Sequence, residues 1–373
     1  MSENDLPEPD RIDGAPHPRE VPGVIGHAAA ERDVLDAWAA GRMHHAWLVT
    51  GPRGVGKATL AWSIARFILA APEGGGEPGL FGEAPPAPDR LGLDPEHPVA
   101  RRVAALSEPG LFVLRRGPNE KGDRLSHDIR VDQVRRLAGF LHLSATEGGR
   151  RVVIVDCADE MNAQAANALL KMLEEPPDRV TFLLVSHQPS ALLPTIRSRC
   201  RALRLAPLGA ADLAAALAQA GIAHEGDTRA LAELAAGSVG EAVRLSVLGG
   251  MGLYAELLAI AGSLPRLDRA RAAKLADAAA ARGAEARLDM LFGLADVLMA
   301  RLARTGATGT PPAVEAAPGE AEVLARLAPT PAAGRAWAAC AQEVGARVRH
   351  GRAVNLDPAS LVLDTVFRIQ QAA

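Results

Sequence analysis

One glycine-rich segment has the residue types and spacing to bind phosphate. The run from Gly51 to Lys57, GPRGVGK, fits the pattern GxxxxGK. It follows the apolar run 46–50 and opens a segment with helical spacing of apolar residues. In that context the backbone N–H groups around Gly51, Gly54 and Gly56 can curl around phosphates, while Lys57 reaches the β- and γ-phosphates. The segment predicts a P-loop, and a tight turn with no link to nucleotides is the alternative.

The position after the lysine departs from the pattern. A working P-loop has Ser or Thr there, whose hydroxyl binds Mg²⁺, but this chain has Ala58. Thr59 belongs to the candidate nucleotide-binding set, yet it is no obvious substitute. One step along a helix rotates a side chain by roughly 100°. We therefore expect weak binding of ATP and Mg²⁺ at most.

A second acidic site is also incomplete. RVVIVD, residues 151–156, reads as a buried strand that ends at Asp156, which resembles the Walker B aspartate that helps to bind Mg²⁺. The next residue in active ATPases is a Glu that activates water, whereas here it is Cys157. Asp159 and Glu160 follow but do not occupy that position. Asp156 could instead simply cap a strand-to-helix turn. Because both sides of one metal site are defective, we expect no hydrolysis by this chain.

These segments require a particular scaffold. Apolar runs at 46–50, 151–156 and 180–186 predict buried strands, with a shorter candidate at 111–114. Helical patterns alternate with them, starting near Asp33, Lys57 and Ile129, and AQAANALLKMLEE is stopped by Pro176-Pro177. This alternation predicts an α/β fold with a doubly wound parallel sheet, ending near Leu205.

The remaining chain suggests further domains. Residues 1–20 are rich in Pro and acidic residues and predict a flexible arm, and 72–124 predict mostly loop. We place the P-loop domain at 21–206, a small helical lid at 207–250 and an all-helical domain at 251–373. The last is rich in Ala and Leu and carries a Pro/Gly interruption around 308–319.

Composition excludes several classes of protein. The 373-residue chain has a net charge of -3, which argues against a solitary DNA-binding protein. Its three cysteines, Cys157, Cys200 and Cys340, form no CxxC pair, so neither a zinc ribbon nor a secreted disulfide framework is expected. No apolar run is long enough to span a bilayer, and the N-terminus is acidic, unlike a signal peptide. We expect a cytoplasmic protein without a metal site.

Several segments together resemble the clamp-loader branch of the AAA+ family. They are Gly26-His27, GRMHHAWLVTGPRGVGKATLA, NALLKMLEEPP, LLPTIRSRC and, near the C-terminus, AVNLDPASLVLD. The resemblance is close over residues 22–206 and weaker through the lid. It implies a P-loop AAA+ domain, a helical lid and a helical collar that assembles the subunits.

The resemblance also implies roles for single residues. In this family, subunits of a pentamer hold ATP at their interfaces, and the arginine of the SRC motif reaches the neighbour's γ-phosphate. Arg199 of Ser198-Arg199-Cys200 is therefore the candidate catalytic residue, and Ser186 falls at the sensor 1 position. Gly240 stands where a sensor 2 arginine is usual. An ordinary surface salt bridge is the alternative for Arg199.

The missing motifs favour one type of subunit. A chain that keeps the SRC arginine but lacks the P-loop Thr, the Walker B Glu and the sensor 2 Arg is expected to be a stator that does not hydrolyse ATP. Its implied partners are the tau/gamma motor subunits, the delta subunit, the sliding clamp and primed DNA, with no membrane. Two alternatives stay open: an ATP-hydrolysing motor subunit of the same DNA polymerase III loader, and a scaffold or adaptor that uses the AAA+ fold alone.

Overall fold

The computed structural model describes the chain except for residues 1–7, 9–10, 72–87, 120, 122, 143–148 and 225. It divides into two compact units. The first comprises Met1–Gly221 with Ser238–Gly240, and the second comprises Ile222–Gly237 with Glu241–Ala373. The predicted lid, 207–250, is shared between the two units. The domain boundaries drawn from the sequence stay predictions.

The first unit is built on a parallel sheet of five strands in the order β2-β3-β4-β1-β5. The strands are β1 (Ala46–Thr50), β2 (Leu111–Arg115), β3 (Arg151–Asp156), β4 (Val180–Ser186) and β5 (Arg201–Arg204). Every residue of β1 and β4 is buried, as a continuous apolar run requires when helices cover both faces of a sheet. The predicted α/β fold with a parallel sheet is confirmed.

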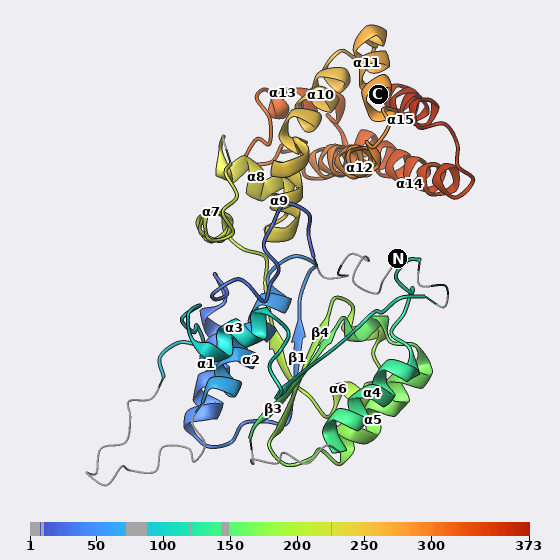
Figure 1. Ribbon diagram of the computed structural model, residues 1–373. Helices are drawn as coiled ribbons and strands as arrows, with labels where there is room; N and C mark the ends of the chain where they lie inside the picture. The colour runs from blue at the N-terminus through green and yellow to red at the C-terminus, as the bar shows by residue number, and fades with distance from the viewer. Residues whose placement is uncertain are drawn as a thin grey trace. The chain divides into compact units, whose positions relative to one another are not determined.

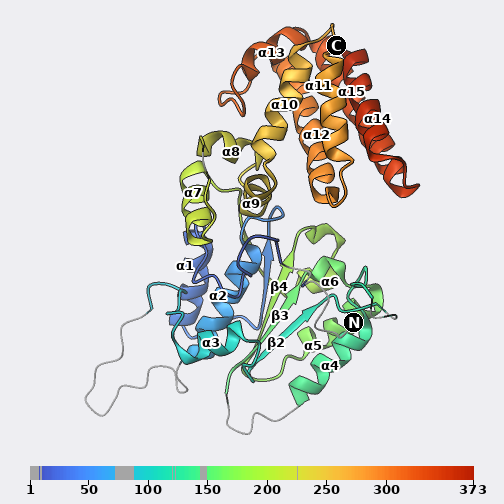
Figure 2. The same ribbon diagram turned by 45° about the horizontal axis from the view of Figure 1, so that its top comes forward.

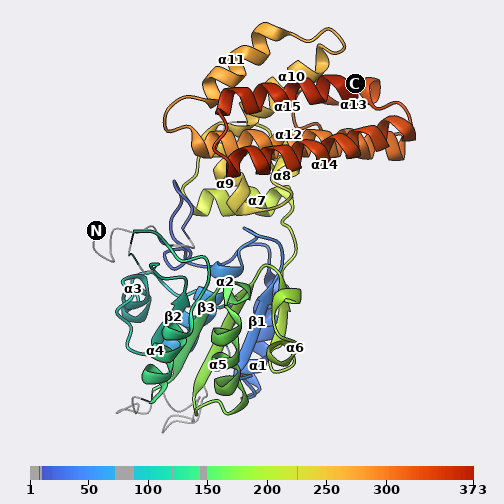
Figure 3. The ribbon, with the colours of Figure 1, turned by 90° about the vertical axis from the view of Figure 1, so that its right-hand side faces the viewer.

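Helices cover both faces of this sheet. The helices that lie wholly within this unit are α1 (Ala28–Ala39), α2 (Lys57–Ala70), α3 (Pro98–Ala104), α4 (Val131–His142), α5 (Ala163–Glu174), α6 (Pro194–Arg197) and α7 (Ala210–Gln219). Helices α1 to α3 lie on one face, and α4 to α6 lie on the other (Figures 1 and 3). Two short 3₁₀ turns, Ala158–Glu160 and Pro189–Ala191, follow β3 and β4. The sheet thus brings the ends of β1, β3 and β4 to one edge.

Two local elements differ from the sequence prediction. Helix α3 lies in the stretch 72–124 that we expected to be mostly loop. It forms because Pro98 stands at its first position and the His97 side chain accepts from the N–H of Val99. Strand β5 follows the SRC segment, in a stretch for which the sequence analysis named no strand, although it ended the sheet near Leu205. The loop predicted at 72–87 lies outside the described residues.

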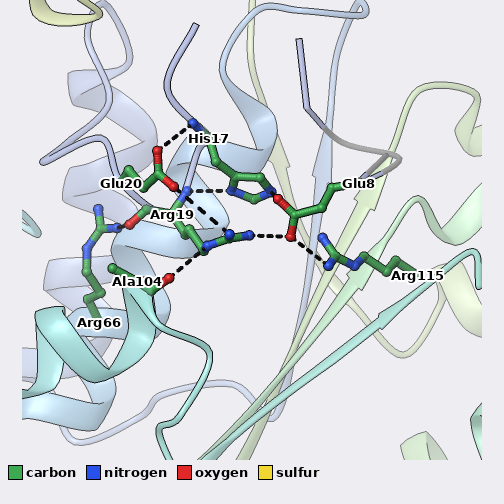
Figure 4. A network of polar contacts seen from close by, with 7 residues as sticks. All are labelled: Glu8, His17, Arg19, Glu20, Arg66, Ala104 and Arg115. Atoms are coloured by element: carbon green, nitrogen blue, oxygen red, sulfur yellow. Dashed lines mark hydrogen bonds and ion pairs between the residues drawn. The ribbon is translucent and has the colours of Figure 1, made fainter. Parts of the chain in front are cut away.

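The segment before α1 packs against the sheet unit. Arg19 donates to Glu8 at 2.7 Å and to the carbonyl of Ala104 at 2.9 Å, and Arg115 donates to the same Glu8 carboxylate at 2.8 Å (Figure 4). His17 is fully buried, 3.8 Å from Glu8. Arg66 of α2 donates to the backbone carbonyl of Arg19. The composition that predicted a flexible arm gave no sign of these contacts.

The second unit is helical. Its helices are α8 (Thr228–Leu234), α9 (Val239–Leu248, whose first residues belong to the sheet unit), α10 (Gly250–Gly262), α11 (Arg269–Ala279), α12 (Glu285–Thr308), α13 (Glu320–Leu327), α14 (Pro331–Ala353) and α15 (Pro358–Ala372). The long helices α12 and α14 pack side by side, and α15 packs against α11 and α14 (Figure 2). Gly306 and Gly334 make the α12–α14 approach possible. A Cβ on Gly306 would lie 2.6 Å from the Cα of Gly334.

A buried ion pair lies inside the helical unit. Arg301 of α12 donates through Nε and Nη2 to the two carboxylate oxygens of Glu320, at 2.6 and 3.0 Å. Their side chains are 7% and 1% exposed. Glu320 also accepts from the Tyr254 hydroxyl and from the N–H of Ala316. This network ties α10, α12 and the start of α13 together.

Within the described residues, no single helix has the length and apolar composition to cross a membrane. Only the pair α9 and α10 passes that test together, and this pair is bent by 77°.

Candidate nucleotide site and interface arginine

The P-loop has the conformation that its glycines predict. It connects the end of β1 to the start of α2, and Gly51, Gly54 and Gly56 have φ values of 145°, 76° and 104°. A Cβ on Gly51 would lie 2.4 Å from the carbonyl oxygen of Leu205, just past β5. A larger residue therefore could not occupy this position without moving the neighbouring backbone.

Lys57 is turned back into its own loop. Its ammonium donates to the carbonyls of Gly51 at 2.8 Å and Pro52 at 2.5 Å, and the residue is 2% exposed. Burial lowers the pKa of Lys57 to about 8, although the acidic groups around Asp156 partly oppose it. The lysine that should reach for a phosphate is thus satisfied by main-chain oxygens.

The start of α9, with Ser238 just before it, contacts the P-loop. The N–H of Gly240 donates to the carbonyl of Gly54 at 3.0 Å. A Cβ on Gly54 would lie 2.3 Å from the Ser238 hydroxyl oxygen, and one on Gly240 would lie 2.9 Å from Cδ1 of Ile12. The absence of a side chain at the expected sensor 2 position is therefore what permits this close backbone contact.

The Walker B end has a thiol in the place of a base. Cys157 Sγ donates to Asp156 Oδ1 at 3.1 Å and lies 3.1 Å from Nε2 of His187. Burial, followed by the charge of Asp156, raises the pKa of the Cys157 thiol, so the thiol keeps its proton at neutral pH. Burial, together with Lys57, lowers the pKa of His187 to about 4. This neutral pair cannot replace a glutamate that takes a proton from water.

The remaining candidate residues have different surroundings. Ser186 ends β4, pairs in register with Thr50 of β1 and is fully buried. Its hydroxyl has no hydrogen-bond partner among the described residues, so a water or a ligand would have to satisfy it. Thr59 lies on α2, one position beyond Ala58, and is half-buried.

The residues present do not match a complete Mg²⁺–ATP site. The hydroxyl ligand is missing at Ala58, the base is missing at Cys157, and Lys57 binds its own loop. Among the described residues, no group of three or more His, Cys, Asp and Glu side chains could hold a metal ion. We therefore assign no phosphoryl-transfer step to this site.

Arg199 lies at the other end of the sheet. It follows α6 and precedes β5 by one residue, and its side chain is 35% exposed. Its Nη1 donates to the carbonyl of Thr195 at 2.9 Å, and its Nη2 lies 2.8 Å from Oε1 of Glu174, the last residue of α5. Within this chain Arg199 thus makes the surface salt bridge that was the alternative reading of the sequence. A role across an interface stays a prediction.

The strand pairing separates the two candidate sites. Strands β1 and β5 are parallel, with Trp47 opposite Arg201 and Thr50 opposite Arg204. The P-loop follows the carboxyl end of β1, whereas Arg199 precedes the amino end of β5. At about 3.3 Å per residue, these ends are roughly 10 Å apart along the strands, and Arg199 lies two residues before Arg201. Arg199 and Lys57 therefore do not form one site within the chain.

Three participants were not predicted from the sequence. His187 directly follows Ser186 at the end of β4, which could have marked it as a neighbour of Asp156. Glu174 ends the helix stopped by Pro176, but nothing local indicates its pairing with Arg199. The contact of Gly240 with Gly54 joins residues far apart in sequence and has no local signal.

The region that contains these candidate sites is similar in sequence to known proteins. The family model described as "DNA polymerase III, delta subunit" matches residues 26–209, which include the P-loop, the Walker B strand and the SRC segment. The delta-prime subunit of DNA polymerase III from Pseudomonas aeruginosa is 44% identical over 156 residues, which cover 42% of this chain and 41% of the relative. Residues 26–209 of the chain are thus similar to the DNA polymerase III delta-prime subunits.

Related subunits match less closely. A DNA polymerase III gamma/tau subunit from Mycobacterium tuberculosis (strain H37Rv) is 32% identical over 182 residues, covering 49% of this chain and 28% of the relative. A solved gamma subunit-related protein from Thermotoga maritima aligns with 91% of this chain and 99% of its own, at 17% identity and a TM-score of 0.42. The match to the delta-prime relative spans less than half of that protein's length, and the similarity to this family lies within the sheet unit.

Proposed function

We propose that this chain works as the delta-prime subunit of a DNA polymerase III clamp loader. In this role it assembles with tau/gamma and delta subunits in the cytoplasm and helps to load the sliding clamp onto primed DNA. Arg199 would serve ATP bound by a neighbouring subunit, while the chain's own P-loop would hydrolyse none. The similarity of residues 26–209 to the delta-prime subunits supports the choice of complex.

One observation carries the division of labour between the two sites. The phosphate end lacks the metal-binding hydroxyl and the base, and its lysine is bound internally. The opposite end presents an arginine with more than a third of its side chain exposed. A guanidinium carries a permanent charge and a planar set of donors, which suits the charge that spreads over γ-phosphate oxygens during transfer. This geometry supports a role in which the chain supplies an arginine to an ATP site on another subunit and does not use an ATP site of its own.

The test is a reconstituted loader that contains Arg199→Ala or Arg199→Lys. An arginine supplied from another chain can be worth about 10³–10⁵ in rate, and a loader with several ATP sites should show a smaller loss because the other sites continue to work. We expect both variants to assemble and to lower the ATP turnover stimulated by clamp and primed DNA. Lysine should rescue little, because a point charge lacks the planar fork of donors.

A matched control lies two residues away. Arg197 is exposed and belongs to α6, so Arg197→Ala removes the same charge from the same surface. This control should keep nearly full turnover. Full turnover in an intact complex with Arg199→Ala would refute the proposed role of Arg199. Failure of the unaltered chain to join the other subunits would refute the choice of complex.

A further inference from the structure

We propose that Glu174 is a positioning residue for Arg199, which it holds within the chain until a phosphate from a neighbouring subunit displaces it. The inference rests on the proposed function of Arg199. The contact is specific: Nη2 lies 2.8 Å from Oε1 of Glu174, while Nη1 donates to the Thr195 carbonyl at 2.9 Å. The two terminal nitrogens of the guanidinium are thus both held by groups of its own chain.

The carboxylate of Glu174 lies at the C-terminal end of α5, which is an electrostatically unfavourable position for an acidic side chain. Glu174 is the last residue of α5, whose end is fixed by Pro176 and Pro177. Carbonyls at a helix C-terminus carry partial negative charge, so an acidic side chain there is repelled. Arg199 offsets this repulsion. Removing the charge of Glu174 relieves the same repulsion, so a Gln variant should fold as well as the unaltered chain.

The contact is well suited to being exchanged. The Glu174 side chain is 43% exposed and that of Arg199 is 35% exposed, so water and salt weaken their attraction. A γ-phosphate offers more negative charge and more acceptor oxygens than one carboxylate, and it can bind the guanidinium through two parallel hydrogen bonds. A neighbour's phosphate should therefore win the competition, although the carboxylate reduces its apparent affinity.

The size of this effect follows from the strength of an exposed pair. Only molecules in which Arg199 is free of Glu174 can bind the phosphate. The apparent affinity for the phosphate is therefore reduced in proportion to the fraction of molecules with a free arginine. The usual strength of an exposed ion pair corresponds to a factor of about two to six. Releasing the arginine should therefore lower the apparent KM for ATP and leave kcat nearly unchanged. A purely structural role for Glu174 would not separate KM from kcat in this way.

The experiment uses the reconstituted loader with clamp and primed DNA, and it measures ATP turnover against ATP concentration. Glu174→Gln should lower the apparent KM about two- to sixfold. Glu175→Gln is the matched control, because Glu175 is the adjacent exposed carboxylate and none of the ion pairs among the described residues involves it. That control should keep the KM of the unaltered complex. Combining Glu174→Gln with Arg199→Ala should give the kinetics of Arg199→Ala alone.

The outcomes separate this inference from the proposed function. An unchanged or raised KM for Glu174→Gln, in a series where Arg199→Ala lowers turnover, would overturn the role of Glu174 and leave the role of Arg199 intact. The same lowered KM for Glu175→Gln would show a general charge effect and would also overturn it. Normal turnover with Arg199→Ala would instead refute the proposed function itself.

Discussion

The carbonyl oxygen of Gly54 accepts a hydrogen bond from the N–H of Gly240 at 3.0 Å. This bond joins the P-loop to the first turn of α9. A Cβ at Gly54 would lie 3.2 Å from the Cα of Gly240, so neither residue has room for a side chain unless its partner moves. The first prediction follows from this contact.

Gly54→Ala should destabilise the chain by about 1–3 kcal/mol, because a left-handed φ of 76° is unfavourable for alanine and the new methyl group meets the Ser238 hydroxyl. The control is Gly139→Ala in α4, where a Cβ would meet nothing within 4 Å, and which should stabilise by about 0.5–1 kcal/mol. Urea unfolding of the purified chain measures both. Equal midpoints for Gly54→Ala and the unaltered chain would show that the loop accommodates the methyl group.

The purified chain should turn over no ATP beyond the level of a Lys57→Ala variant. Ala58 supplies no ligand to Mg²⁺, and the Cys157 thiol keeps its proton because burial and Asp156 raise its pKa. Release of radioactive phosphate from labelled ATP measures the rate. The lysine variant identifies any contaminating ATPase, because a contaminant's rate is the same in both preparations. Turnover that disappears with Lys57→Ala would show a working site and would favour a motor subunit.

The Glu8 contacts should make stability depend on pH. Burial alone would raise the pKa of Glu8, but hydrogen bonds from Arg19 and Arg115 outweigh it and lower the pKa to about 2, from 4.5 in an unfolded chain. The stabilisation is therefore complete above pH 4.5 and is lost as pH falls towards 2. We expect Glu8→Gln to lower the urea midpoint at pH 7 and to have little effect near pH 2.

The control for the pH dependence is Glu96→Gln. Glu96 pairs with Arg101, and both side chains are largely exposed, so this substitution should move the midpoint little at either pH. A loss for Glu8→Gln that is equally large at both pH values would mean that the carboxylate contributes by packing, not by its charge.

In the helical unit, Glu320→Gln should destabilise by up to about 3–5 kcal/mol, because it leaves the buried Arg301 with only the more exposed carboxylate of Glu233, 3.4 Å from its Nη1. Asp364→Asn tests an exposed pair in the same unit, since Asp364 accepts from Arg347 at 2.6 and 2.9 Å. It should change stability little, because water screens that pair. Thermal unfolding of the full chain compares the two. A similar loss of stability in both variants would contradict the prediction that the buried ion pair contributes more than the exposed one.

Much of the sheet unit could be predicted from sequence because its signals are local. The strands β1, β3 and β4 are apolar runs, the P-loop follows β1, and Asp156 ends β3. Strand β5 has no such signal. In RALR, only Leu203 is buried, and pairing with β1 is what makes the segment a strand. Pattern reasoning has no access to a partner strand that is distant in the sequence.

The same limit applies to the candidate sites. Which residues were missing from the phosphate site could be read directly at Ala58 and Cys157. The contacts that fill this region could not be predicted from the sequence. The carbonyls bound by Lys57 and the contact between Gly54 and Gly240 depend on the folded path of the backbone. The pairing of Arg199 with Glu174 likewise joins two segments that become neighbours only when α5 packs against α6.

The parallel register of β1 and β5 has a consequence for how such a protein can evolve. The phosphate loop and Arg199 stand at opposite ends of one strand pair and share no side-chain contact, so substitutions at one end leave the other undisturbed. Selection can therefore act on the two ends as separate traits. A gene copy that loses its metal ligand and its base can therefore keep an intact arginine at the opposite end of the sheet without any change of fold.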